Sequence, residues 1–116
     1  MILLHVIDDF HLQGILAKMK QKAWWQKQEG YKPMYENDYQ TALFIHSLSW
    51  SIFISLPLFF VPVNMLALNI SIFVNTAIHY IVDDLKCNKM KINLGTDQLI
   101  HFVQIFLTWL VIGFLS

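Results

Sequence analysis

The chain contains three long apolar stretches in which polar residues are few and Lys and Glu are absent. The stretches run from Thr41 to Val61, from Val63 to Val82 and from Leu99 to Leu115. Each comes close to the ~20 residues that an α-helix needs to cross ~30 Å of hydrocarbon. Helices of soluble proteins carry a charged face along one side, and these stretches carry none. The pattern therefore predicts three membrane-spanning helices.

The N-terminal segment mixes apolar side chains with polar ones, among them His5, Asp9 and Gln13. A secretory signal peptide has a basic start and an uninterrupted apolar middle, whereas this segment is acidic in the middle and its lysines come at the end. We expect a short membrane helix whose polar face is buried against the other three. The predicted fold is an all-α integral membrane four-helix bundle, with three full spans and this short N-terminal helix. The predicted helices cover residues 1–19, 40–61, 63–85 and 96–115, in one domain that includes an interfacial loop at 20–39.

Composition agrees with a membrane protein and excludes several other classes. Apolar residues make up 56% of the chain and charged residues 14%, against about 45–50% and about 25% in soluble domains. This supply of apolar surface excludes a disordered chain. Eight Lys balance eight acidic residues and Arg is absent, so no basic stripe can hold nucleic acid. The single cysteine, Cys87, excludes a disulfide scaffold and a cysteine-based zinc site.

The lysines lie in two of the three predicted loops. The first loop carries Lys18, Lys20, Lys22, Lys27 and Lys32, and the third carries Lys86, Lys89 and Lys91. The second loop, around Pro62, has none. Because cytoplasmic loops are enriched in Lys and Arg, we expect the first and third loops in the cytoplasm and both termini outside.

Three His/Asp pairs are spaced four residues apart within the predicted helices. They are His5 with Asp9, His79 with Asp83, and Asp97 with His101. Residues at this spacing lie on one helix face, one turn apart. The second helix adds His46, and the predicted topology places all of these side chains at one depth, just inside the cytoplasmic boundary. Ionisable groups inside a membrane are costly and normally face the protein interior, so we expect these side chains to converge.

Four imidazoles and three carboxylates could bind a divalent metal ion, and zinc is favoured. One zinc ion needs three or four ligands. Seven donors therefore fit either one ion with an outer layer of hydrogen-bonding groups, or two ions that share a bridging carboxylate. Each residue alone also fits a structural role: Asp83 and Asp84 could end the third helix, and an acid such as Asp97 is favourable in a first helical turn.

The leading functional interpretation is a metal-dependent hydrolase in the inner membrane. A bound divalent ion lowers the pKa of its water toward ~7 and polarises the group under attack. Asp84 or Asp83 is the candidate general base. The candidates that orient substrate or a ligand, or that meet a phosphate, are Gln13, Gln98 and Lys86. A site near the headgroups indicates a lipid or lipid-linked substrate, and the pattern is compatible with a homo-oligomer.

The alternative interpretation is a non-enzymatic membrane protein. A polar cluster among membrane helices also suits a structural metal that clamps the helices, an ion or proton pathway, or an interaction or exclusion factor. The outer halves of the second and fourth helices carry Ser, Phe, Leu and Val. That composition favours a pocket open to one side over a pathway through the membrane. Asn75 precedes His79 by one turn and is expected to orient it.

The chain resembles a family of small integral membrane proteins of bacteria and their phages, whose domain has no known function. The matching stretches are His5–Gln13 (HVIDDFHLQ), His79–Asp83 (HYIVD) followed by Lys86, Asp97–His101 (DQLIH), and His46 within IHSL. They follow the family's order and spacing over nearly the whole chain, although Asp84 stands where an aromatic residue is usual. The resemblance implies a four-helix membrane protein and supplies no activity, so function has to be argued from the site.

Overall fold

The chain folds into helices joined by short segments, which confirms the all-α prediction. The computed structural model describes residues 1–116. Its elements are α1 (Ile2–Ile7), η1 (Asp8–Leu12), α2 (Leu16–Met19), α3 (Lys22–Gln26), η2 (Pro33–Tyr35), α4 (Asp38–Ser55), η3 (Leu56–Phe60), α5 (Met65–Cys87) and α6 (Leu94–Leu115). Three segments are long and apolar enough to cross a membrane: Pro33–Phe60, Met65–Cys87 and Leu94–Leu115.

Polar side chains and a proline fix the ends of the long helices. The side chain of Asn64 accepts two backbone N–H groups at the start of α5, and that of Asn93 accepts one at the start of α6. An N-cap of this kind contributes about 1 kcal/mol. α4 ends at Ser55, and Pro57 lies in the 3-10 turn η3 that follows. Proline lacks the N–H group that a continued α-helix would need.

The N-terminal helix expected over residues 1–19 is interrupted. α1 continues as the π-helix η1, the chain turns at Gly14, and α2 is a separate turn of helix. Gly14 has a φ of +52°, a conformation that glycine adopts without steric cost. α1 and η1 are 6 and 5 residues long, so together they cover about 16 Å, roughly half the hydrocarbon thickness. The expected loop at 20–39 also contains two short helices, α3 and η2.

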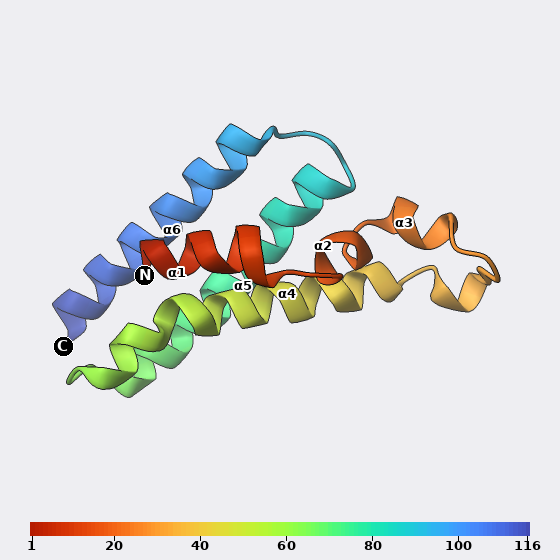
Figure 1. The fold of residues 1–116 in the computed structure, drawn as a ribbon. Coiled ribbons are helices and arrows are strands. Elements are labelled where there is room, and N and C mark those ends of the chain that lie inside the picture. The colour runs from red at the N-terminus through yellow and green to blue at the C-terminus, as the bar shows by residue number, and fades with distance from the viewer.

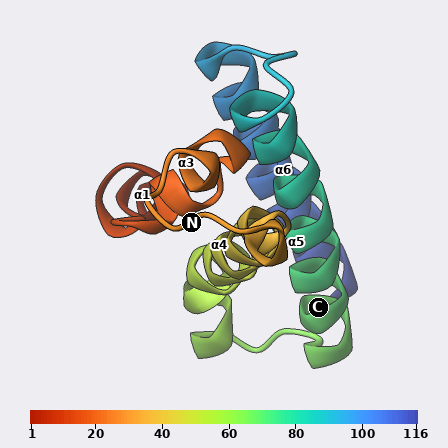
Figure 2. The same ribbon diagram turned by 90° about the vertical axis from the view of Figure 1, so that its right-hand side faces the viewer.

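The long helices form two layers. α5 and α6 run antiparallel, α4 crosses beside α5, and α1 lies along α4 (Figure 1). Viewed from the side, α1 and α4 make up one layer and α5 and α6 the other (Figure 2). The side chain of Asn88, at the end of α5, donates to the backbone oxygen of Lys20 and accepts from the backbone nitrogen of Lys22. The two lysine-bearing segments therefore meet at one end of the molecule.

The bundle interior is rich in polar residues, and many large apolar residues lie on its outer surface. More than half of the 26 buried residues are polar or charged, whereas large apolar side chains such as Phe73, Phe106 and Trp109 are exposed. A soluble protein buries most of its large apolar side chains instead. This inverted distribution fits a protein surrounded by lipid, in which ionisable groups face the bundle interior.

α4, which has its most extensive contact with α5, buries three serines. Ser47, Ser51 and Ser55 are fully buried along one face of α4. Each hydroxyl donates to the backbone oxygen four residues earlier in its own helix. Small side chains at four-residue spacing are typical of close helix contacts in membranes. This close packing brings the polar faces of the two helices together.

Candidate metal centre

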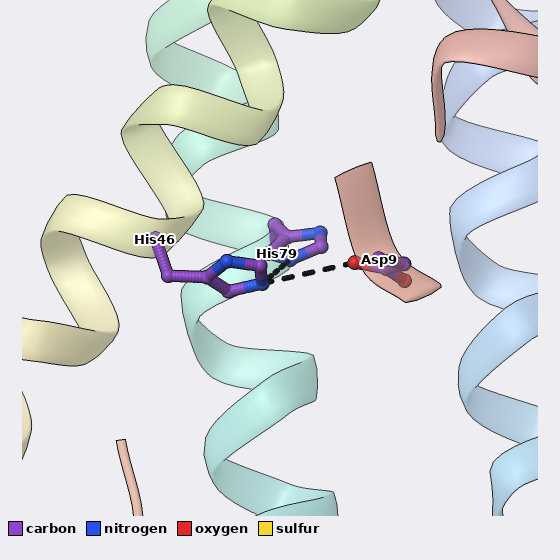
Figure 3. Close-up of side chains that lie close together, drawn as sticks. All are labelled: Asp9, His46 and His79. Atoms are coloured by element: carbon purple, nitrogen blue, oxygen red, sulfur yellow. Dashed lines mark hydrogen bonds and ion pairs between the residues drawn. The ribbon is translucent and has the colours of Figure 1, made fainter. Parts of the chain in front are cut away.

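Side chains from four elements converge in the interior of the bundle. η1 contributes Asp9, α4 contributes His46, α5 contributes His79 and Asp83, and α6 contributes Asp97 and His101. Two groups of donor atoms lie close enough to share an ion: Asp9, His46 and His79, and then His79, Asp83 and His101. Figure 3 shows the first group, in which two imidazoles and a carboxylate from three elements point toward one another.

His46 and His79 are the closest pair of imidazoles. Their Nε2 atoms lie 3.1 Å apart, and Oδ2 of Asp83 lies 3.3 Å from the first and 3.7 Å from the second. Oδ1 of Asp9 lies 3.7 Å from Nε2 of His46. These four residues are called the histidine-pair site below. With metal–ligand bonds of about 2.0–2.2 Å, the ligand atoms of a tetrahedral zinc site are about 3.3–3.6 Å apart, so the spacing among His46, His79 and Asp83 fits one ion, and Asp9 lies beside it.

A second group of donors faces the other carboxylate oxygen of Asp83. Nε2 of His101 lies 3.5 Å from Asp83 Oδ1 and 3.3 Å from Asp97 Oδ1. Asp83, Asp97 and His101 are called the Asp97 site below. The rings of His79 and His101 are stacked, with their centroids 4.2 Å apart. The carboxylate of Asp83 therefore stands between the two sites.

The buried side-chain atoms that lack a hydrogen-bond partner all lie in or next to this cluster. They are Asp8 Oδ2, His79 Nδ1, Asp97 Oδ1 and His101 Nε2. A buried polar group left unpaired costs about 1–3 kcal/mol. An ion or a water molecule is a common explanation for such groups in a native fold. Imidazole nitrogen and carboxylate oxygen are donors that divalent transition metals bind well.

His5 is buried beside the cluster, but both of its ring nitrogens are already engaged. The indole N–H of Trp50 donates to Nδ1 at 2.8 Å, and Nε2 lies 3.0 Å from Oε1 of Gln98. Because an indole only donates, Nδ1 accepts, and Nε2 carries the proton that goes to the amide oxygen. The neutral ring has no lone pair left for an ion. The sequence predicts that His5 is a metal ligand. In the structure its hydrogen bonds are those of a residue that positions Gln98.

Gln98 and Gln13 orient carboxylates. Nε2 of Gln98 donates to Asp9 Oδ2 at 3.2 Å and to Asp97 Oδ2 at 3.0 Å. Nε2 of Gln13 donates to the backbone oxygen of Asp9 at 2.6 Å and to its Oδ1 at 3.3 Å. Hydrogen bonds of this kind fix ligand side chains around metal sites. The two amides therefore lie where the sequence-based interpretation needs them, next to candidate ligands.

The charged groups of Lys86 and Asp84 are both paired with other side chains, and neither is free to act in the cluster. Nζ of Lys86 lies 2.7 Å from Asp97 Oδ2, so its ammonium group is already paired with a carboxylate. Asp84 accepts from Asn88 at 2.9 Å and pairs with Lys89 at 3.2 Å. Successive residues of an α-helix point about 100° apart. Asp83 therefore faces the cluster and Asp84 faces the loop, so Asp84 is not placed to act as a base on a metal-bound water.

Sequence reasoning missed Lys20, which was assigned to the interfacial loop. Its side chain is buried, and Nζ lies 2.6 Å from Asp83 Oδ2. The helix breaks at Gly14, and α2 then continues along α4 and packs against it (Figure 1), which places Lys20 inside the bundle. Hydrophobic periodicity gives no signal for such a turn, because the flanking residues keep the same apolar character.

A hydrogen-bond network behind His101 was also missed. Nδ1 of His101 lies 3.0 Å from Oε1 of Gln104, whose Nε2 donates to both oxygens of Asn75 at 3.2 and 3.3 Å. Asn75 in turn donates to Thr108 at 2.7 Å. Asn75 was expected to orient His79, but it positions Gln104 instead. The spacing of three residues between His101 and Gln104 was the available signal, because it places both on one helix face.

An apolar cluster closes the interior at the opposite end of the bundle. It consists of Leu58, Ala67, Leu68, Ile72 and Ile112. These residues come from η3, the start of α5 and the end of α6, away from the His/Asp cluster. Apolar side chains, and not ionisable ones, therefore fill this end of the bundle.

No protein-family model, curated protein or solved structure matches this chain, so the resemblance to a family of small membrane proteins stays a prediction.

Proposed function

We propose that this protein is a membrane-embedded, metal-dependent hydrolase whose divalent ion, preferably zinc, is held at the histidine-pair site. The observation that carries the proposal is the meeting of His46, His79 and Asp83. Their nearest donor atoms are separated by 3.1 to 3.7 Å. Two imidazoles and a carboxylate are a ligand set found in catalytic zinc sites, where a water molecule takes the remaining position.

The charge inside the bundle supports a divalent ion. Four side-chain carboxylates lie in or beside the cluster, from Asp8, Asp9, Asp83 and Asp97, and two ammonium groups pair with them, from Lys20 and Lys86. The carboxylates therefore outnumber the ammonium groups by two. Excess negative charge in a low-dielectric interior is unfavourable, and bound cations would offset it.

Hydrolysis is the chemistry that such a site would support. A divalent metal ion lowers the pKa of its bound water toward ~7. Asp9 is the best-placed general base, because Gln13 and Gln98 hold its carboxylate beside the histidine pair. The ammonium group of Lys20 stands where it can stabilise negative charge that develops on a substrate oxygen.

The expected substrate is a lipid or a lipid-linked compound. Asp83 and Asp97 lie near the ends of α5 and α6 that adjoin the lysine-bearing segments, and their partners His79 and His101 lie one helical turn deeper. Under the positive-inside rule this end faces the cytoplasm of a bacterial inner membrane. A substrate whose reactive group sits at the headgroup level could then reach the site from the bilayer.

Metal analysis of the full chain, purified in detergent, tests the proposal. We expect bound zinc in the wild type and its loss in Asp83→Asn, with Asp84→Asn as a control whose neighbouring carboxylate faces the loop. The same three proteins, reconstituted in vesicles of phosphatidylethanolamine and phosphatidylglycerol, are assayed for release of soluble headgroup and free fatty acid. Zinc-dependent release in the wild type and in Asp84→Asn, but not in Asp83→Asn, supports the hydrolase. Absence of bound metal from the wild type overturns it.

A structural metal that clamps the helices is the second candidate, and the burial of the cluster favours it. The side chains of Asp9, His46, His79, Asp83, Asp97 and His101 are at most 7% exposed. A catalytic ion needs a path for substrate, whereas a structural ion is fully enclosed. If chelation lowers the unfolding temperature while no hydrolysis is detected with bound zinc, the structural role is the correct one.

A further inference from the structure

We infer that the Asp97 site binds a second divalent cation, so that the carboxylate of Asp83 bridges two metal ions. This inference rests on the proposed function, because it places the second ion next to the one at the histidine-pair site. The donors of the second ion are Asp97 Oδ1, His101 Nε2 and Asp83 Oδ1.

Two of these donor atoms are buried and have no hydrogen-bond partner. Oδ1 of Asp97 and Nε2 of His101 lie 3.3 Å apart, and both residues are fully buried. The other oxygen of Asp97 accepts from Lys86 at 2.7 Å and from Gln98 at 3.0 Å. The carboxylate is therefore held on one side, and its free oxygen is directed at the imidazole.

The hydrogen bonds behind His101 set the tautomer that a metal ligand needs. Gln104 donates its amide N–H groups to Asn75, so its Oε1 is the atom that faces Nδ1 of His101. An amide oxygen only accepts, and Nδ1 of the neutral ring must therefore carry the proton. The lone pair is then on Nε2, which points at the two carboxylates. An acceptor behind the ring, which takes the proton on the second nitrogen, is the usual arrangement for a metal-bound histidine.

The position of Asp83 supplies the bridge. Its Oδ2 lies 3.3 Å from Nε2 of His46, and its Oδ1 lies 3.5 Å from Nε2 of His101. A carboxylate that binds one ion through each oxygen holds the two ions at a short separation, about 3.5–4 Å in two-metal hydrolytic sites. Asp83 and His79 are contributed by α5, which stands between the ligands from α4 and those from α6.

Counting ions per chain tests this inference separately from the proposed function. The full chain is stripped with a chelator, equilibrated with buffered zinc in detergent, and analysed for metal and protein. We expect two ions in the wild type and one in His101→Ala. The matched control His11→Ala, an exposed histidine outside the cluster, should keep two. Asp97→Asn, which preserves the side-chain shape, is the second variant in case His101→Ala fails to fold, and it should also bind one ion.

Manganese provides an independent readout of the distance between the ions. Protein loaded with Mn²⁺ should give the spin-coupled electron paramagnetic resonance spectrum of a manganese pair, and Asp97→Asn should give the spectrum of an isolated ion. One zinc ion in the wild type, or two ions that persist in both variants, overturns the inference and leaves the proposed function standing. A wild type that binds no ion overturns the proposed function itself, and this inference with it.

Discussion

One hydrogen bond decides whether a buried histidine can act as a metal ligand. His5 and His101 both lie in the bundle interior, next to carboxylates. Trp50 donates to His5 and occupies its acceptor nitrogen, whereas Gln104 faces Nδ1 of His101 with an acceptor and leaves Nε2 free. The sequence pairs each histidine with an aspartate in the same way. The two roles separate only when the partner behind the ring is known.

Substituting His5 should therefore weaken metal binding without removing a ligand. In His5→Ala, Gln98 loses its partner and holds Asp9 and Asp97 less firmly. Loss of such a supporting contact typically lowers metal affinity about 10–100-fold. We expect the number of ions per chain at saturation to stay the same in a zinc titration, while His79→Ala loses bound metal. If His5→Ala loses as many ions as His79→Ala, His5 is a ligand.

Removing the buried ammonium of Lys20 should strengthen metal binding. Nζ lies 2.6 Å from Asp83 Oδ2, so it competes with a cation for this oxygen. A unit charge about 5 Å from a divalent ion opposes binding by about 7 kcal/mol at an effective dielectric constant of 20, and solvation of the freed Asp83 carboxylate offsets part of this. Lys20→Met should therefore bind zinc at least about tenfold more tightly, a change of roughly 1.4 kcal/mol.

Competition with a chromophoric zinc chelator measures this change in affinity. Lys22→Met is the matched control, because that lysine pairs with the exposed Glu36 at 3.4 Å and should bind zinc as the wild type does. Equal affinities in the wild type and in Lys20→Met would contradict the competition between Lys20 and the ion.

The sequence predicts best the helices that are apolar along most of their length. α5 and α6 are mostly apolar, and their ends lie within two residues of the predicted ranges, 63–85 and 96–115. The first span, Pro33–Phe60, begins seven residues before the predicted start at residue 40. The His/Asp pairs within these helices also converge as their four-residue spacing indicates. Helix geometry alone sets both features.

The N-terminal segment could not be predicted in the same way. Its break depends on Gly14, whose left-handed conformation permits a turn but does not require one. Apolar and polar residues continue on both sides of the break without a change of pattern. The burial of Lys20 follows from this turn. The partners of His5 come from α4 and α6, and hydrophobic periodicity predicts neither feature.

A substitution at Gly14 tests the importance of this turn. The position has a φ of +52° and no neighbour within 4 Å of an added Cβ, so Gly14→Ala introduces backbone strain without a clash. The strain should cost about 1–2 kcal/mol and lower the unfolding temperature of the protein in detergent. Gly113→Ala, at an α-helical position that also has open space around the Cβ, should cause no decrease. Equal unfolding temperatures in both variants would show that α2 does not need the left-handed turn.

At the scale of the whole molecule, the distribution of polarity and the distribution of charge point to the same arrangement in a membrane. The interior holds the ionisable groups, and the outer surface of the long helices is apolar. The lysine-bearing segments are joined through Asn88 at one end of the bundle. The α4–α5 connection and the C-terminus lie together at the other end (Figure 1). The positive-inside rule predicts that the lysine-bearing end faces the cytoplasm and the other end faces outward.

Single cysteines in a Cys87→Ser background test this orientation in bacterial cells. Val61→Cys and Ser116→Cys should react with a membrane-impermeant maleimide added to intact cells whose outer membrane has been permeabilised. Lys91→Cys should react only after the inner membrane is broken, because cytoplasmic loops carry the excess of lysine. The opposite labelling pattern would invert the orientation and leave the fold intact. Reaction of Val61→Cys and Lys91→Cys from the same side would mean that α5 does not cross the membrane, and the description of Met65–Cys87 as a span would be wrong.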